Sequence, residues 1–296
     1  MTEIEIKKLV NSFRADSCGF NVYVITKNVP KLKKIGFVEE ENNLRHKIRN
    51  SIIETLLKKF GSEDAQYVSA DRIADEQDKF YIINTSEEYD PFAFLKTNHG
   101  RFSEDDISDA KGIVFEIKDG EHVLWAYQHL WNISVPNKAK NKILARLISS
   151  SQEDVFEELL SPIITFSNKI DLLVIGDSII TSDYKLLQNY FGFQNYIRIR
   201  AEKAISTISS MGIVANVEKL TDYVQRGDGK PKYAKKMMRI MDSKVLKMDT
   251  DELFDNIHKS SRWNGSFKSW YDADHIFYFI LLLSYKHTPK YNILVK

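Results

Sequence analysis

The sequence predicts an α+β fold with strands and a long amphipathic helix in its N-terminal half, then a central β-hairpin and a mainly helical C-terminal half. Apolar residues recur every four positions over residues 40–60, which is the spacing of one helix face. Residues 170–181 form two short apolar runs joined by Gly176-Asp177, a turn dipeptide that suits a hairpin. Beyond residue 196 the apolar spacing is helical up to residue 286.

The N-terminal half contains alternating strand patterns around the long helix. Gly61 ends this helix, and Asp119-Gly120 is a second strong hairpin turn. From the N-terminus onward we expect a short helix at 2–14, paired strands at 20–27 and 33–38, and the helix at 40–60. A strand at 80–84, a short helix near 91–96 and a hairpin of 112–118 with 122–129 follow.

Residues 132–152 contain Pro136, several Asn and Ser residues and few aromatic residues, which indicates a boundary with one internal helix at 140–147. We therefore predict an N-terminal α+β domain over residues 1–152 and a C-terminal domain over 153–296. The second domain would contain the hairpin, a helix that Gly192 ends, and further helices at 196–210, 217–225, 231–241, 250–259 and 272–286.

The composition excludes several classes of protein. With 43% hydrophobic and 28% charged residues, the 296-residue chain is globular rather than disordered. Its one cysteine, Cys18, cannot form an internal disulfide, which fits a reducing cytoplasm. The N-terminus lacks the features of a signal peptide, and the longest apolar run, 276–283, is too short to cross a bilayer. We expect a cytoplasmic protein with no cofactor, and no metal site because the histidines do not cluster.

Charge is unevenly distributed, although the formal net charge is only +1. Residues 63–90 contain nine acidic residues against Arg72 and Lys79, whereas residues 226–247 contain eight Lys and Arg against Asp228 and Asp242. The overall charge gives no argument for nucleic-acid binding, but the basic segment does. The acidic segment is either a docking face for a basic partner or a solubilising surface.

The predicted helix 231–241 carries four cations on one face, because Lys232, Lys235, Lys236 and Arg239 are spaced i, i+3, i+4 and i+7. An anionic partner would relieve their repulsion, and backbone phosphate is the natural candidate. A solvated basic face explains the same pattern. The candidate DNA-binding residues are these four and their basic neighbours Lys230, Lys244, Lys247, Arg198 and Arg200.

The tripeptide Glu116-Ile117-Lys118 offers a second possible chemistry. On a strand, Glu116 and Lys118 share one face, and Asp90 lies upstream. Nucleases of the PD-(D/E)xK type use such an Asp and Glu to hold Mg²⁺ while the Lys stabilises charge near the scissile phosphate. A solvent-facing strand pair explains the tripeptide equally well. We assign no catalytic residue and expect a protein that is not an enzyme, with this nuclease as the alternative.

The central segment resembles a known family. Lys169-Ile170-Asp171 precedes an apolar strand, and the Gly176-Asp177 turn, the second strand and an aromatic-ended helix follow. Residues 19–25 (GFNVYVI) and 279–282 (FILL), with Lys290-Tyr291 and Lys296, agree with the same pattern. The chain thus resembles the KwaB family, the B proteins of the bacterial Kiwa anti-phage defence system, over nearly its whole length.

The resemblance implies a cytoplasmic anti-phage protein that binds DNA without sequence preference. It also implies a membrane-embedded partner, KwaA, which would recruit the protein to the inner membrane. The family carries no invariant catalytic residues to transfer to this chain. We further expect a homodimer, because paired basic patches raise the effective local concentration on one polymer.

Overall fold

A computed structural model describes most of the first 225 residues and five residues beyond them. The described residues are 1–26, 31–37, 42–69, 79–97, 99–130, 145–149, 154–158, 167–210 and 217–225, with 234, 235, 237, 238 and 240. They fall into two compact units. The first comprises Met1–Tyr67 and Ile82–Asp183, and the second comprises Val68–Tyr81 and Tyr184–Lys296.

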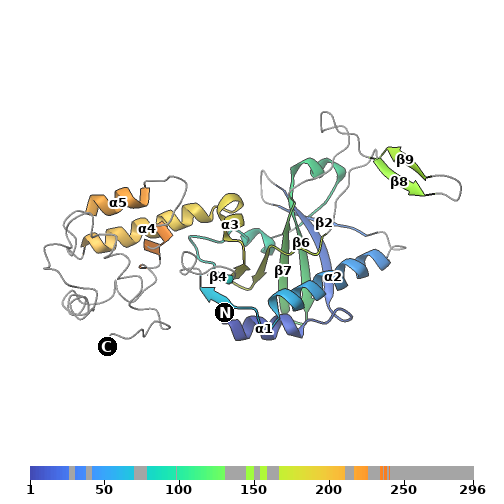
Figure 1. Cartoon of the computed structure of the whole chain (residues 1–296), viewed down its shortest axis with the longest axis horizontal. Coiled ribbons are helices and arrows are strands. Elements are labelled where there is room, and N and C mark those ends of the chain that lie inside the picture. Colours follow the sequence, from blue (N-terminus) through green and yellow to red (C-terminus); the bar gives the residue numbers. More distant parts are fainter. Residues whose placement is uncertain are drawn as a thin grey trace. The chain divides into compact units, whose positions relative to one another are not determined.

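A mixed sheet of nine strands forms the main feature of the described chain (Figure 1). In spatial order its strands are β3 (Tyr67–Ser69), β4 (Phe80–Asn84), β11 (Ser178–Thr181), β10 (Leu172–Ile175), β7 (His122–His129), β6 (Ala110–Asp119), β1 (Gly19–Thr26), β2 (Leu32–Ile35) and β5 (Gly100–Arg101). The five central strands from β11 to β1 pair antiparallel, and β5 pairs parallel to β2. The two end strands have only three and two residues.

Two glycine-containing turns place the hairpins where the sequence predicts them. Gly120 has a φ of 57° between β6 and β7, and Gly176 has a φ of 56° between β10 and β11. Only glycine adopts this left-handed backbone without steric cost. The central hairpin is therefore confirmed, and it pairs directly with β7 of the N-terminal half, Leu172 lying opposite Tyr127.

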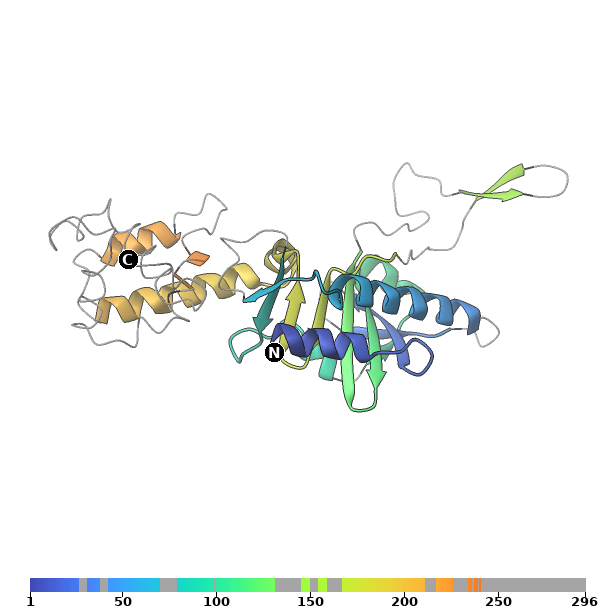
Figure 2. The same cartoon turned by 60° about the horizontal axis from the view of Figure 1, so that its bottom comes forward.

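Helices α1 (Glu3–Ser12) and α2 (Asn42–Phe60) lie side by side against one face of the sheet, as both views show (Figures 1 and 2). Ile6 of α1 and Leu56 and Phe60 of α2 are fully buried. The side chain of Asn11 donates to the carbonyl oxygen of Gly61 at 2.9 Å and so joins α1 to the end of α2. The long amphipathic helix predicted for residues 40–60 is confirmed.

The segment around residue 145 differs from the prediction. Ala145–Ser149 (β8) and Asp154–Glu158 (β9) form a separate antiparallel pair, so the helix predicted over 140–147 is wrong for residues 145–147. The short run of apolar residues there fits a strand as well as a helix, and pairing with β9 decides between them. Residues 150–153 lie outside the described chain, and a domain division at residue 152 stays a prediction.

Helices follow the central hairpin in the described part of the C-terminal half. They are α3 (Tyr184–Tyr190), α4 (Phe193–Ser210) and α5 (Val217–Gln225), and Gly192 separates the first two with a φ of 70°. The predicted helices at 250–259 and 272–286 lie outside the described residues, and only five residues of 231–241 lie within them. The short 3₁₀ helices η3 (Ala93–Lys96) and η4 (Glu104–Asp109) belong to the first unit. Among the described helices, none is long and apolar enough to cross a bilayer.

Candidate functional site

Glu116 is a buried carboxylate at the centre of the sheet. It is only 3% exposed, and its Oε2 atom accepts hydrogen bonds from the side chains of Asn21 at 2.7 Å and Tyr23 at 3.0 Å. Its Oε1 atom lies 2.8 Å from the ammonium of Lys118, whose side chain is about half exposed. Strand register explains this arrangement, since Asn21 in β1 lies directly opposite Glu116 in β6.

These contacts keep Glu116 ionised. Burial alone raises the pKa of a carboxyl group, but the hydrogen bonds from Lys118, Asn21 and Tyr23 outweigh it and hold the pKa of Glu116 below its ordinary value. The effect on Tyr23 is the opposite, because its burial and the neighbouring Glu116 raise the pKa of the phenol. At neutral pH the sheet thus holds a fixed negative charge next to a neutral phenol.

Glu116 lines a cavity of about 1230 Å³ within the first unit. The cavity is formed by α1, the segment from Asp90 to His99, the β6–β7 hairpin and the end of β10. Asp90, Glu116 and Lys118, the three residues of the nuclease hypothesis, all line it. Among the described residues, however, no group of three or more His, Cys, Asp or Glu side chains is arranged to hold a metal ion.

An aromatic group borders Glu116 in the cavity wall. Trp125 of β7 lies directly opposite Glu116 in the sheet register and is half-buried. The ring of His99 packs edge-on against Tyr23, with centroids 4.8 Å apart, and against Trp125 at 6.2 Å. Its Nδ1 atom is buried and has no hydrogen-bond partner among the described residues. Because burial lowers the pKa of His99, the ring is neutral at pH 7.

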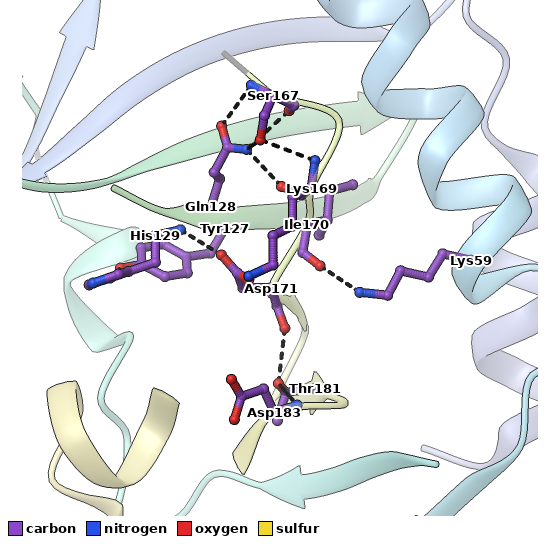
Figure 3. Close-up of polar contacts among 10 residues, drawn as sticks. All are labelled: Lys59, Tyr127, Gln128, His129, Ser167, Lys169, Ile170, Asp171, Thr181 and Asp183. Carbon is purple, nitrogen blue, oxygen red and sulfur yellow. Dashed lines mark hydrogen bonds and ion pairs between the residues drawn. The ribbon is translucent and has the colours of Figure 1, made fainter. Parts of the chain in front are cut away.

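A second polar cluster surrounds Asp171, in the Lys169-Ile170-Asp171 segment that precedes β10 (Figure 3). Asp171 is 4% exposed, its Oδ2 atom accepts from the backbone N–H of His129 at 2.7 Å, and its Oδ1 atom lies 2.8 Å from Lys169. Its backbone carbonyl accepts from the hydroxyl of Thr181 at 2.9 Å. Asp171 therefore joins the end of β7 to both strands of the central hairpin.

The residues beside Asp171 extend this cluster through backbone groups (Figure 3). The Gln128 side chain donates to the carbonyl oxygens of Ser167 at 3.0 Å and Lys169 at 2.9 Å. Lys59 of α2 donates to the carbonyl oxygen of Ile170 at 2.8 Å, and burial lowers the pKa of this lysine. Nearly all of these bonds satisfy backbone groups where strands begin or end, so the cluster is structural.

Comparison with known protein families decides the relationship of the chain. A family model described as "Kiwa protein KwaB-like" matches residues 107–279, more than half of the chain. The chain belongs to the KwaB-like family. No curated protein and no solved structure matches it significantly. The predicted family is thereby confirmed, and the Asp171 cluster gives a physical reason for the polar residues by which the sequence resembles KwaB.

The KwaB-like match covers some of the residues around Glu116 and not others. Glu116, Lys118 and Trp125 lie within residues 107–279, whereas Asn21 and His99 precede them. Sequence reasoning missed Asn21, Tyr23, His99 and Trp125. A hairpin turn at Asp119-Gly120 pairs Asp119 with His122. Continuing this pairing away from the turn places Trp125 opposite Glu116. The sequence contains no comparable signal for Asn21, which the β1–β6 register places opposite Glu116, or for His99, which packs against Tyr23 and Trp125.

Three of the nine candidate DNA-binding residues of this KwaB-like protein lie within the described chain. Lys235 is buried at 7% exposure, and its ammonium lies 3.8 Å from the centroid of the Tyr184 ring. Arg198 on α4 is exposed, donates to Asn195 at 3.0 Å and lies 3.9 Å from Glu202. Arg200 is half-buried. The other six, Lys230, Lys232, Lys236, Arg239, Lys244 and Lys247, lie outside the described residues.

Lys235 therefore differs from the exposed cation that the helical spacing predicts. An ammonium over an aromatic face gains a cation–π attraction that partly replaces its hydration. Tyr184 also packs edge-on against Tyr81, with ring centroids 5.8 Å apart, so the cation sits on a supported aromatic pair. This position indicates that Lys235 anchors its segment within the second unit. Whether Lys235 also contacts DNA stays a prediction.

Proposed function

We propose that this protein acts in Kiwa anti-phage defence by binding DNA without sequence preference through its basic C-terminal segment. Membership in the KwaB-like family supports the defence role. The binding mode rests on one observation, the eight Lys and Arg residues among residues 226–247. Contacts to backbone phosphates carry no sequence information, and their strength depends steeply on salt. Occupied phage DNA would then be a poor template for replication or transcription.

The described residues refine this proposal. Lys235 is buried against Tyr184, so its role is to hold the segment in place. The phosphate contacts fall to Lys232, Lys236 and Arg239, with Arg198 as an exposed cation on α4. Separating these roles changes the choice of variants, because a charge reversal at a buried lysine would disturb folding as well as binding.

The test compares two triple charge reversals of equal net charge. The first replaces Lys232, Lys236 and Arg239 with Glu. The second, a control, replaces Lys31, Lys47 and Lys58, which are exposed lysines of the first unit. Binding to labelled duplexes of unrelated sequence is measured by fluorescence anisotropy over a range of salt concentrations.

The first variant should lose most binding at moderate salt on every duplex. The slope of log affinity against log salt should fall by roughly 2 to 3, since each lost phosphate contact removes about 0.9. The control should keep its slope and nearly all of its affinity. Equal losses in both variants would mean that net charge alone drives binding, and unchanged binding in the first would reject the basic segment as the DNA contact.

A membrane partner and a dimer are further parts of this proposal. We propose that KwaA, the membrane protein implied by the family, brings the protein to the inner membrane. Co-purification of the two proteins from detergent extracts, with and without the triple reversal at Lys232, Lys236 and Arg239, tests whether partner and DNA use different surfaces. Light scattering of the purified protein gives its mass in solution, which should equal that of a homodimer.

A Mg²⁺-dependent nuclease is the second candidate, because Asp90, Glu116 and Lys118 line the same cavity. In this arrangement the oxygens of Glu116 already accept from Asn21, Tyr23 and Lys118, which leaves about one acceptor position for a metal ion. Incubating a labelled duplex with protein and Mg²⁺ distinguishes the two functions. A DNA clamp leaves the strands intact, whereas a nuclease cuts them and loses this activity in Glu116→Gln.

A protein adaptor is the third candidate, with the acidic segment 63–90 as its binding face. Residues 70–78 of this segment lie outside the described residues. The adaptor would co-purify with the membrane protein and show no affinity for DNA. A result of that kind would replace the DNA-binding proposal.

A further inference from the structure

The cavity beside Glu116 differs from the basic segment in its chemistry. Its lining includes the acidic residues Glu5, Asp90, Glu116, Asp119 and Glu121 against the lysines Lys8, Lys96 and Lys118. The side chains of these eight residues together carry a formal charge of −2. Such a lining repels phosphate and attracts cations. DNA binding therefore does not account for this cavity.

Three groups in the wall accept a hydrogen bond or attract a cation. Glu116 is ionised and accepts three hydrogen bonds, whereas a carboxylate offers about four acceptor positions. His99 is neutral, and its buried Nδ1 atom has no partner among the described residues. A buried polar atom of this kind calls for a partner, and a neutral imidazole nitrogen can accept one. Trp125 contributes an aromatic surface directly opposite Glu116.

These three groups lie close together. Tyr23 donates to Glu116 at 3.0 Å, the His99 ring is 4.8 Å from the Tyr23 ring, and Trp125 is 6.2 Å from His99. A planar cation with several N–H donors satisfies all of them at once. It can stack on the indole and donate to the carboxylate and the imidazole. A guanidinium has this shape and this set of donors, whereas an ammonium lacks the flat face.

We propose that the cavity is a binding site for a guanidinium group, held between Trp125, Glu116 and the Nδ1 atom of His99. Lys118 then has an unexpected role. Its ammonium occupies one side of Glu116 at 2.8 Å, where it competes with an incoming cation. Because Lys118 is about half exposed, it can turn towards solvent when the guanidinium enters. The ligand is either a small guanidinium compound or the arginine of a protein segment, and the cavity volume of about 1230 Å³ admits both.

The experiment follows the indole N–H signal of Trp125 by two-dimensional NMR of the full-length protein, assigned with Trp125→Phe. The probes are N-acetyl-arginine-methylamide and its uncharged analogue N-acetyl-citrulline-methylamide, which has nearly the same shape. A five-residue peptide with arginine at its centre, and the same peptide with citrulline, represents the protein source. Guanosine monophosphate and Mg²⁺ are titrated separately as the anionic and metal alternatives.

We expect saturable shifts of the Trp125 signal with the arginine compound, and binding weaker by about tenfold or more with citrulline. Glu116→Gln should weaken arginine binding by a similar factor, while Glu54→Gln, at an exposed glutamate of α2, should leave it unchanged. Lys118→Met should strengthen arginine binding by roughly threefold or more, because the competing cation is gone. Tighter binding of the arginine peptide than of the arginine compound would identify a protein segment as the source of the guanidinium. Tighter binding of the compound would identify a small molecule as the source.

Several results would overturn the proposal. Equal binding of arginine and citrulline would remove the role of charge, and this comparison needs no variant to fold. Weaker arginine binding in Lys118→Met, or guanosine monophosphate or Mg²⁺ shifting the Trp125 signal where arginine does not, would assign the cavity to an anion or a metal ion. None of these outcomes depends on whether the basic segment binds DNA.

Discussion

Glu116 in β6 and Asp171, directly before β10, are two buried carboxylates that resemble each other closely in their charge pairing. Each is almost completely buried, and each lies 2.8 Å from a lysine two residues away, Lys118 or Lys169, whose own side chain is about half exposed. They differ in their remaining partners. Asp171 accepts from the backbone N–H of His129, whereas Glu116 accepts from the side chains of Asn21 and Tyr23 and lines a cavity.

This difference distinguishes a structural carboxylate from one that can bind a ligand. Removing Asp171 leaves a buried backbone N–H without its acceptor, which destabilises the strands it joins. Removing the charge of Glu116 disturbs side chains that can rearrange, and it changes the electrostatics of a cavity. Ion-pair distance and burial alone would place both residues in one class.

The largest expected effect is the loss of stability in Asp171→Ala. We expect the free energy of unfolding to fall by about 3 kcal/mol, because the His129 N–H loses a charged acceptor inside the protein. Asp177→Ala is the matched control, since Asp177 is an exposed aspartate of the adjacent turn, 3.5 Å from Lys96. Asp177→Ala should lower the free energy of unfolding by about 0.5 kcal/mol or less. Urea unfolding followed by circular dichroism measures both, and similar losses in the two variants would remove the structural role of Asp171.

A smaller effect is expected for Glu116→Gln, about 1 to 2 kcal/mol at pH 7. The pKa of Glu116 is lowered in the folded protein, so its stabilisation is fully present above the ordinary glutamate value of 4.5. It is lost as the pH falls below that value and through the lowered pKa. The difference in stability between wild type and Glu116→Gln should therefore shrink between pH 5 and the acid limit of folding. A difference that is constant with pH would contradict an ionised Glu116.

The smallest effect is expected for the two lysines. Lys118→Met and Lys169→Met should each cost at most about 1 kcal/mol, because half-exposed ammonium groups retain much of their hydration. Thermal unfolding of the two variants, compared at low and high salt, measures these values. A loss well above 1 kcal/mol in Lys118→Met alone would make the Glu116 pair structural as well, and the comparison would fail.

Local sequence signals predicted much of the central sheet. Glycine-containing turns identified both hairpins, and a strict four-residue repeat identified α2. The helix predicted at 140–147 is wrong over Ala145–Leu147, where a short apolar run fits either structure and strand pairing decides. Asn21 and Glu116 are 95 positions apart in the chain, so only the strand register brings them together.

The basic segment illustrates another limit of sequence reasoning. Spacing placed Lys235 on the same helix face as Lys232 and Arg239, but the ring of Tyr184 covers it. Helical periodicity says which residues share a face and not what packs against that face. Tyr184 lies 51 residues before Lys235 in the chain, and no local pattern connects the two.

The ends of the nine-stranded sheet have a consequence for how the protein behaves at high concentration. A long exposed strand at the margin of a sheet offers unpaired backbone groups to neighbouring molecules, and chains then polymerise through β-pairing. Here the marginal strands β3 and β5 offer only three and two residues, and β5 has a charged side chain at Arg101. Within the part of the chain that the structure describes, the ends of this sheet therefore offer crowded copies few backbone groups on which to extend it.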